Sequence, residues 1–367
     1  MHKIVISGYY GFNNIGDESI LKAVVNNLRE EFESVDITVL SQDPALTQEK
    51  FGIRAIDRMN IINIIMAIKS CDLLISGGGS LLQDSTSKRS ILYYIGIIWI
   101  SLLFKKKVFI YSQGIGPITQ RWNRKLVKKV LNRLHYIVVR DVQSKELLCE
   151  IGVDKNKIYV TADPVISLKP VSLEAGRLSL IKAGLMPDSQ QVKVGIALRG
   201  LKIKDEFVTE IIDFTKEIIH KYNAKVVFIP FHFNEDMPII EKMERILGDK
   251  CFYIKNKHLT EEMLSIIGNM DLLIGVRLHS LIHAAIMDIP MIAIAYDPKI
   301  NSFMHALNMK ALCSIYDLKS EFLLEEFERV QKEKEHMQWE IKKNINQLVE
   351  DFKLNQRLIK DLLEEKK

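Results

Sequence analysis

The stretch DLLIGVRLHSLIHAAIMDIPMIAIAYD, residues 271–297, contains the pattern that decides the fold. Asp271 to Val276 has the apolar run of a buried strand, a helical segment follows, and Ile289 to Ala295 is a second buried strand. Two strands joined through a helix indicate a parallel sheet, whose ligands bind at the carboxyl ends of the strands. Arg277 and His279 occupy the turn at that point.

The two residues of this turn combine an anion clamp with an acid. Arginine offers a planar fork that matches carboxylate or phosphate, and histidine side chains titrate near neutral pH. The same residues also fit an ordinary strand–turn–helix unit with no functional role. His283 follows His279 by four positions, but Leu281 replaces the glutamate of an HExxH motif, so no zinc site is predicted.

Composition indicates a globular protein of two domains. The chain has 367 residues, of which 47% are hydrophobic and 26% charged. We find no signal peptide pattern before the strand-like run Ile4–Ile6. The four cysteines form no CxxC pair, which is typical of reduced thiols. We therefore expect a cytoplasmic protein, with the inner face of the cell membrane as a place where it could bind peripherally.

Strands and helices alternate along most of the chain, which predicts an α/β fold with parallel sheets. We expect a Rossmann-like domain over residues 1–167 and a second one over 192–320. Residues 168–191 carry Pro and Gly without a strand pattern and are expected to be a linker. The charged helical region 321–367 is expected to pack back on the body.

Two Gly-rich loops follow strands of the first domain, GYYGFNNIGDE at 8–18 and SGGGSLLQDSTS at 76–87. Glycine lets a ligand approach the backbone closely. The first loop lacks the GxGxxG spacing, so a dinucleotide is not predicted. Asp17 and Asp84, within these loops, could instead cap helices.

Further polar residues end other strands. QGIGP at 113–117 and VRD at 139–141 follow strands of the first domain, and Arg140 could simply pair with a neighbouring acid. In the second domain, Arg199 and His232 end strands as Arg277 and His279 do. We expect these four side chains to form a cationic pocket for a small polyanion.

Two segments raise the question of a membrane surface. Residues 121–133 place basic side chains on one side of a predicted helix, which fits either a solvated face or a surface that meets anionic headgroups or a diphosphate. No nucleic-acid-binding module accompanies them. Residues 91–107 include a fourteen-residue apolar run, shorter than the roughly 20 residues that span a bilayer. It is predicted as a buried helix or a partly exposed membrane-facing one.

The motifs at 8–18, 76–87, 113–117, 139–141 and 275–285 together resemble the polysaccharide pyruvyl transferase family, in its CsaB-like branch. The similarity runs over residues 3–315. It implies two Rossmann-like domains facing each other across a cleft, the GT-B glycosyltransferase architecture. It also implies transfer of pyruvate from phosphoenolpyruvate to a sugar as a 4,6-ketal with release of phosphate. For this branch the sugar is N-acetylmannosamine in a lipid-diphosphate-linked precursor of a secondary cell-wall polymer that anchors S-layer homology domains.

The resemblance assigns roles to individual residues. His279 and Asp84 would be catalytic, and Arg277 and Arg140 would bind phosphoenolpyruvate. We add Arg199 and His232 to the donor site because of their positions at strand ends. The acceptor is expected at residues of the two Gly-rich loops, namely Gly11, Asn14, Asp17, Gly78, Gly79 and Ser80. No metal and no cofactor are predicted, because phosphoenolpyruvate is a co-substrate.

Two other functions remain open from the sequence. A GT-B glycosyltransferase of cell-wall or exopolysaccharide synthesis would bind a nucleotide sugar instead of phosphoenolpyruvate. A noncatalytic polymer-binding or membrane-associated scaffold would need neither Arg277 nor His279. The sequence predicts no oligomeric state and no identity for the acceptor sugar.

Overall fold

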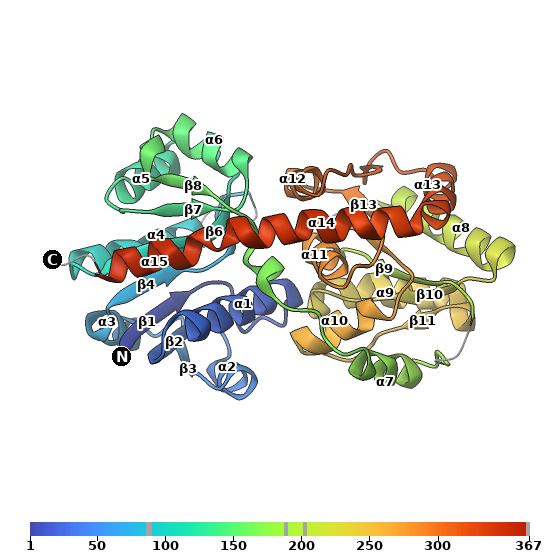
Figure 1. Ribbon diagram of the computed structural model, residues 1–367, viewed down its shortest axis with the longest axis horizontal. Coiled ribbons are helices and arrows are strands. Elements are labelled where there is room, and N and C mark those ends of the chain that lie inside the picture. The colour runs from blue at the N-terminus through green and yellow to red at the C-terminus, as the bar shows by residue number, and fades with distance from the viewer. Residues whose placement is uncertain (86–89, 187–189, 201–203, 365–367) are drawn as a thin grey trace. The chain divides into compact units, whose positions relative to one another are not determined.

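The computed structural model describes residues 1–85, 90–186, 190–200 and 204–364. The chain forms two compact units, each built around its own parallel sheet (Figure 1). Unit 1 comprises Met1–Phe12, Asp17–Leu168 and Leu348–Lys367, and unit 2 comprises Asn13–Gly16 and Lys169–Gln347. The predicted α/β fold with two Rossmann-like units is confirmed.

The sheet of unit 1 has the strand order β3-β2-β1-β4-β6-β7-β8, with β5 paired to β6, and every pairing is parallel. All its carboxyl ends therefore lie at one edge. Its strands are apolar runs buried by helices on both faces. They are β1 (His2–Ser7), β2 (Val35–Ser41), β3 (Arg54–Asp57), β4 (Leu73–Ser76), β5 (Gly79–Leu82), β6 (Lys107–Ile115), β7 (Ile137–Val139) and β8 (Ile158–Val160).

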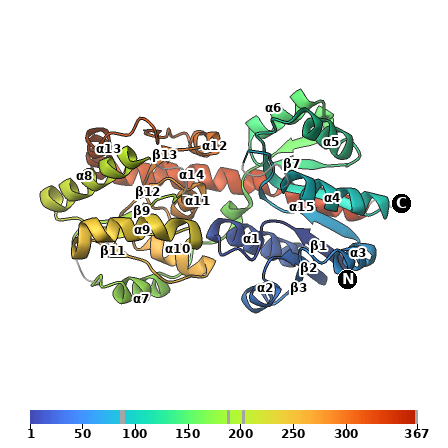
Figure 2. The same ribbon diagram turned by 180° about the vertical axis from the view of Figure 1, so that it is seen from behind.

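Helices cover both faces of this sheet (Figures 1 and 2). One face packs in a single core against α3 (Ile61–Ser70), α4 (Ser90–Leu103), α5 (Arg121–Leu131) and α6 (Val142–Ile151). The opposite face carries α1 (Ile15–Glu31) and α15 (Leu354–Glu364), while α2 (Pro44–Phe51) connects β2 to β3. Near α15, Tyr111 meets Phe352 with ring centroids 5.8 Å apart.

Residues 91–103 of the apolar run lie in α4, one side of which is buried as the first prediction expects, while Leu103 and Phe104 at its end are exposed. Its buried side chains include Ile91, Tyr94, Ile95, Ile97 and Ile98. Within the described residues, no helix combines the length and apolar character needed to cross a bilayer.

Unit 2 has a six-stranded parallel sheet in the order β11-β10-β9-β12-β13-β14. Its strands are β9 (Lys193–Ala197), β10 (Lys225–Phe228), β11 (Phe252–Tyr253), β12 (Leu272–Gly275), β13 (Met291–Ala295) and β14 (Cys313–Ser314). Its helices are α7 (Glu174–Lys182), α8 (Asp205–Tyr222), α9 (Phe233–Leu247), α10 (Thr260–Gly268), α11 (Leu278–Ile286), α12 (Pro298–Ala306), α13 (Ser320–Lys332) and most of α14 (Lys334–Phe352).

The segment 168–191, expected as a linker, differs from that expectation. From Lys169 onward it belongs to unit 2, where α7 packs against α10. The backbone N–H of Gly176 donates to Ser265 Oγ at 2.7 Å, and a Cβ on Gly176 would lie only 2.3 Å from the Ser265 carbonyl oxygen. Close packing of α7 against α10 at Gly176 thus holds this segment in unit 2. Pro187 lies outside the described residues.

The C-terminal region divides between the units. Helices α13 and α14 begin in unit 2, whereas Leu348–Lys367 belongs to unit 1. Asn355 of α15 is buried and accepts a hydrogen bond from Ser112 Oγ at 3.1 Å.

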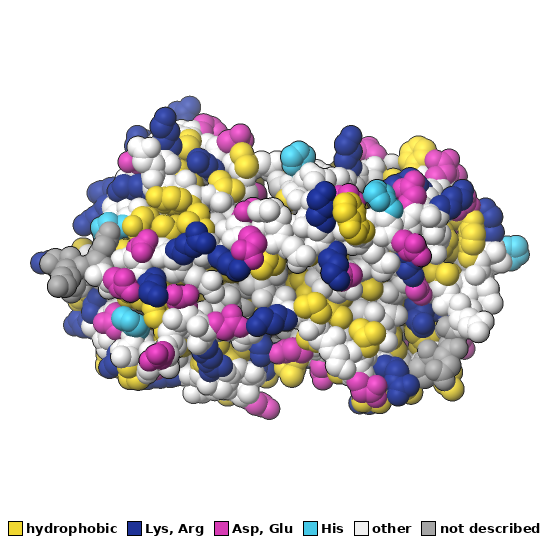
Figure 3. Space-filling model, viewed as in Figure 1, with side chains coloured by type: hydrophobic (Ala, Val, Ile, Leu, Met, Phe, Trp, Pro, Cys, Tyr) yellow, Lys and Arg dark blue, Asp and Glu magenta, His cyan; other side chains and the backbone are white. Residues whose placement is uncertain are grey.

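The face drawn in Figure 3 mixes Lys and Arg with Asp and Glu side chains, so charge of neither sign dominates it.

Candidate functional site

The turn between β12 and α11 lies at the carboxyl edge of the unit 2 sheet, as the sequence predicts. β12 is a central strand, because β9 and β13 pair with it on either side. Arg277 is the N-cap residue of α11, so both Arg277 and His279 stand where the unpaired N–H groups of a helix begin.

Two acids of α9 hold the Arg277 guanidinium. Its Nη2 lies 3.0 Å from Glu235 Oε2 and also forms an ion pair with Asp236, whose carboxylate is fully buried. Burial alone would lower the pKa of Arg277, but Asp236 and Glu235 outweigh that effect and raise it. Arg277 is therefore a permanently charged group fixed in one position, rather than a cation without partners.

Asp236 joins the ends of three neighbouring strands. Its carboxylate accepts hydrogen bonds from the backbone N–H of Gly200 at 3.0 Å, of Phe231 at 3.1 Å and of His232 at 2.8 Å. Gly200 follows β9 and the other two follow β10, while Arg277 follows β12. One buried carboxylate thus sets the relative positions of these loops.

His232 does not supply the positive charge that we expected of it. It is the N-cap residue of α9, and its Nδ1 accepts from the Glu235 backbone N–H at 3.4 Å. Burial lowers the pKa of His232, an effect that Arg277 strengthens and Glu235 opposes without outweighing it. The imidazole is therefore neutral at neutral pH and orients α9.

Two other cations of unit 2 share the ring of Tyr296. The Arg199 guanidinium lies 4.1 Å from its centroid, and Lys299 Nζ lies 5.1 Å from it. Arg199 Nε has no hydrogen-bond partner within the described part of the chain. Stacking on an aromatic ring positions a cation without neutralising it. The sequence analysis did not name Lys299 as a candidate, because its position after β13 showed only that a strand had ended there.

The segment Asn13–Gly16 belongs to unit 2 and lies beside these residues. The Ile15 N–H donates to the Phe231 carbonyl at 2.8 Å, and Asn14 forms a β-bridge with His232. A Cβ on Gly16 would come 2.1 Å from Nδ1 of the half-buried His279. Asn14, which the sequence analysis expects at the acceptor, thus lies in unit 2 next to His232, because backbone pairing draws this part of the loop to the end of β10.

In unit 1, the other loop residues gather at the carboxyl edge around the turn Gly77–Gly79. Gly79 has φ +87°, and a Cβ on it would lie 3.1 Å from Asp17 Oδ1. A Cβ on Gly78 would meet Ile20 and Pro164, each at 2.9 Å. Asp17, Gly78 and Gly79 are therefore neighbours, as expected for one site.

Two residues earlier in the chain belong to the same edge. Gly11, with φ +80°, donates its N–H to Glu18 Oε1 at 2.9 Å. Burial raises the pKa of Tyr10 well above its usual value, and the charge of Asp17 adds to this effect. The hydroxyl of Tyr10 consequently stays protonated beside the Asp17 carboxylate.

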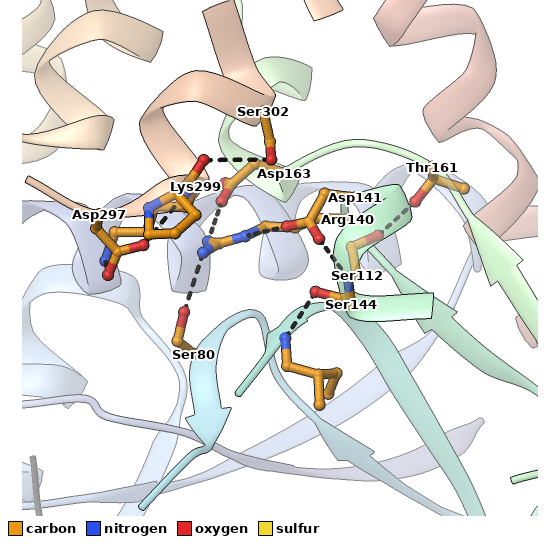
Figure 4. A network of polar contacts seen from close by, with 12 residues as sticks. Ser80, Ser112, Arg140, Asp141, Ser144, Thr161, Asp163, Asp297, Lys299 and Ser302 are labelled. Carbon is orange, nitrogen blue, oxygen red and sulfur yellow. Dashed lines mark hydrogen bonds and ion pairs between the residues drawn. The ribbon is translucent and has the colours of Figure 1, made fainter. Parts of the chain in front are cut away.

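Arg140 contacts one other predicted site residue of unit 1, Ser80, and two acids (Figure 4). Its Nη1 lies 2.8 Å from Asp163 Oδ2, its Nη2 donates to Ser80 Oγ at 3.0 Å, and its Nε lies 3.6 Å from Asp141. A Cβ on Gly114 would lie 2.6 Å from this guanidinium, so the glycine makes room for it. Arg140 is buried, and Asp163 is the acid with which it mainly pairs.

The carboxylate of Asp84 is hydrogen-bonded to residues at the start of α5. Its carboxylate accepts from the N–H and Oγ1 of Thr119 at 2.8 and 2.9 Å, from the Gln120 N–H at 3.0 Å and from Asn123 Nδ2 at 2.9 Å. Burial would raise the pKa of Asp84, but these donors outweigh it and lower that pKa to about 2. A carboxylate with all these donors is a weak base, so the geometry favours a structural role for Asp84. Thr86 and Ser87 of the same motif lie outside the described residues.

Among the described residues, no cluster of three or more His, Cys, Asp or Glu side chains could hold a metal ion. Charged side chains with buried partners, such as Arg277 and Arg140, lie at the carboxyl edge of each sheet.

The two Rossmann-like units give the chain a GT-B-like fold, which it shares with solved structures of other proteins. The structure of HepE from Anabaena with UDP-glucose covers 99% of each chain with a TM-score of 0.68 at 11% identity. UDP-GlcNAc 2-epimerase from Neisseria meningitidis covers 100% of each chain with a TM-score of 0.62 at 14% identity.

The chain belongs to the polysaccharide pyruvyl transferase family, whose model matches residues 14–298. It is also similar to the amylovoran biosynthesis protein AmsJ of Erwinia amylovora, with 22% identity covering 85% of this chain and 88% of that one. Membership makes it an enzyme of polysaccharide biosynthesis that transfers pyruvate.

Proposed function

We propose that the protein transfers pyruvate from phosphoenolpyruvate to a sugar hydroxyl pair as a 4,6-ketal, with release of phosphate. One observation carries this proposal. At the start of α11, Arg277 is fixed by a buried Asp236 and His279 is packed against Gly16, so two residues of one turn are each held in a defined place.

The donor would be held by unit 2. Phosphoenolpyruvate carries a carboxylate and a phosphate, which require at least two cationic contacts at fixed separation. Arg277 supplies one, and Arg199 and Lys299 on Tyr296 supply others. The N–H groups at the start of α11 favour an anion further. Arg140 enters the proposal as the second arginine implied by the family motifs.

His279 would start the reaction by donating a proton to the methylene carbon of phosphoenolpyruvate. C2 becomes electrophilic, and one sugar hydroxyl attacks it while losing its proton to a base. The C–O bond to phosphate then breaks, and phosphate leaves with the electron pair. The second hydroxyl attacks C2 to close the ketal. Of the two protons that the hydroxyls lose through the base, one ends on the departing phosphate and the other restores His279.

The base in this proposal is Asp17 rather than Asp84. Asp17 is partly exposed and lies over Gly79. The hydrogen bonds that Asp84 accepts from Thr119, Gln120 and Asn123 lower its pKa to about 2, which makes it a weak base. Gly78 and Ser80 complete the acceptor side. General-base assistance is worth about 10²–10⁴-fold, so the assignment is measurable.

The acceptor that we propose is a saccharide on a lipid diphosphate, with N-acetylmannosamine of a secondary cell-wall polymer precursor as the sugar. Resemblance to the CsaB-like branch supports this choice. A soluble analogue of this acceptor, a short saccharide diphosphate with a truncated lipid, serves for assays.

The test is phosphate release from phosphoenolpyruvate with and without this acceptor analogue. We expect release only when the acceptor is present, and none from His279→Ala with an unchanged circular dichroism spectrum. Thermal shifts with phosphoenolpyruvate and with UDP-sugars separate the alternative. Stabilisation by a UDP-sugar but not by phosphoenolpyruvate would identify a nucleotide-sugar-dependent glycosyltransferase and refute the proposal.

A further inference from the structure

Helix α3 exposes an unusual number of large apolar side chains. Met59, just before the helix, is 70% exposed, and Ile61, Ile62 and Met66 are 51%, 67% and 56% exposed. The opposite side of α3 inserts Ile64 and Ile68 into the core. Both faces of this helix are thus apolar, although only one of them is buried.

The end of α4 extends the same apolar surface. Leu103 is 60% exposed and Phe104 is 36% exposed. Lys69 of α3 places its Nζ 5.0 Å from the Phe104 ring centroid, which shows that the ends of the two helices adjoin. We call Met59, Ile61, Ile62, Met66, Leu103 and Phe104 the α3 patch. Contiguous exposed apolar residues of this kind mark an interaction surface.

The part of the chain that forms α4 and α5 carries an excess of positive charge. From Ser85 to Arg140 the sequence contains no Asp or Glu and twelve Lys or Arg, although the net charge of the whole chain is only +5. This stretch supplies α4 and α5, which pack with α3 on one face of the unit 1 sheet. The outer side of α5 exposes basic residues and one tryptophan, namely Arg121, Trp122, Lys125, Lys128 and Lys129.

Two acids, Asp57 and Asp72, lie at the margin of the α3 patch, and Glu150 of α6 pairs with Arg124 of α5 at 2.7 Å. Asp57 Oδ1 accepts from the Met59 N–H at 2.8 Å, and Asp72 Oδ2 accepts from the Lys3 N–H at 2.8 Å. Each is a turn or strand-end acceptor at the edge of the layer, while Lys69 and Lys105 are exposed beside it.

We propose that the layer α3–α4–α5 docks on an anionic lipid bilayer surface, with the α3 patch inserted at the headgroup boundary and the basic side of α5 over the phosphates. Apolar side chains flanked by lysines suit that boundary, and each basic residue near an anionic surface adds to the attraction. A two-fold contact with a second copy would place the same basic surfaces together, which like-charge repulsion opposes. Most of the apolar contribution thus comes from α3, which lies outside both segments that the sequence suggested, and Leu103 and Phe104 add the end of the segment 91–107.

The test is co-sedimentation of the full chain with vesicles of phosphatidylcholine containing about 30% phosphatidylglycerol, compared with pure phosphatidylcholine. We expect binding to the anionic vesicles that weakens with added salt. The double variant Ile62→Glu, Met66→Glu should bind at least about tenfold more weakly. Lys125→Glu with Lys128→Glu should lose the preference for anionic vesicles.

The matched control is Leu178→Glu with Met186→Glu, two residues of unit 2 that are 50% and 72% exposed. It should bind vesicles as the wild type does, and all variants should retain activity on the soluble acceptor analogue. Wild-type protein that stays in the supernatant with anionic vesicles would overturn the proposal. So would an equal loss in the control, or a dimer in sedimentation equilibrium that Ile62→Glu, Met66→Glu dissociates.

Discussion

The imidazole of His279 lies directly against the backbone of Gly16, where a Cβ would come 2.1 Å from Nδ1. Gly16 lies within α1 and has no left-handed backbone conformation, so an alanine there would be compatible with the backbone. Its Cβ, however, would clash with the imidazole of His279. The glycine is needed to let His279, the proposed acid, occupy its place.

Gly16→Ala should therefore displace His279 and lower kcat. A misplacement of about 1 Å can cost roughly 10²-fold, and we expect a loss of that order with a smaller change in KM. Phosphate release under saturating substrate measures it. Gly96→Ala is the control, because a Cβ there meets nothing within 4 Å. Wild-type kcat in Gly16→Ala would show that the contact has no catalytic importance.

Asp236→Asn should destabilise unit 2 and abolish donor binding. The substitution removes the charge that neutralises the buried Arg277, and breaking such a pair typically costs about 3–5 kcal/mol. Chemical denaturation gives the free energy of unfolding, and calorimetry gives the affinity for phosphoenolpyruvate. Asp205→Asn, which removes an exposed partner of Lys242, should change neither quantity. Unchanged stability in Asp236→Asn would contradict the organising role of this carboxylate.

Asp17→Asn and Asp84→Asn should separate catalysis from structure. We expect Asp17→Asn to lower kcat by about 10²–10⁴-fold while melting as the wild type does. Asp84→Asn should melt earlier, because the start of α5 loses a charged acceptor, but should keep most of its kcat. The opposite pattern, a folded but inactive Asp84→Asn with a fully active Asp17→Asn, would restore Asp84 as the base.

His232 should make stability depend on pH. Its pKa in the folded protein is lower than the ordinary 6.5, so the unfolded chain binds the proton more readily. The stability of the wild type relative to His232→Asn is thus fully present above pH 6.5 and falls as the pH drops through the folded-state pKa. Asparagine keeps an N-cap acceptor without titrating. Denaturation curves at several pH values check this, and a stability difference independent of pH would contradict it.

Local sequence pattern was enough to predict the sheets and the strand-end positions of Arg277, His279 and Arg140. Apolar runs and the polar turns that follow them are properties of a few adjacent residues. The partners of these side chains could not be predicted in the same way. Glu235 and Asp236 reach Arg277 only because β10 and β12 flank β9, and the donors to Asp84 come from the start of another helix.

Two segments show how tertiary context changes the interpretation of a local pattern. Asn14 lies within a Gly-rich loop, yet its pairing with His232 places it in unit 2. The apolar run in α3 is typical of a buried helix, and only the packing of Ile64 and Ile68 shows which side is buried. Periodicity cannot separate the two faces when both are apolar.

The most direct test of the account is the mass of the product made in D₂O from phosphoenolpyruvate and the saccharide analogue. The proposed mechanism predicts that the acceptor gains pyruvate minus one water, with one solvent deuterium in the new methyl group because His279 delivers an exchangeable proton. His279→Ala should give no product. An acceptor that remains unmodified by the wild type, or that gains a hexose when a UDP-sugar is supplied, would contradict the proposed donor and the role of His279.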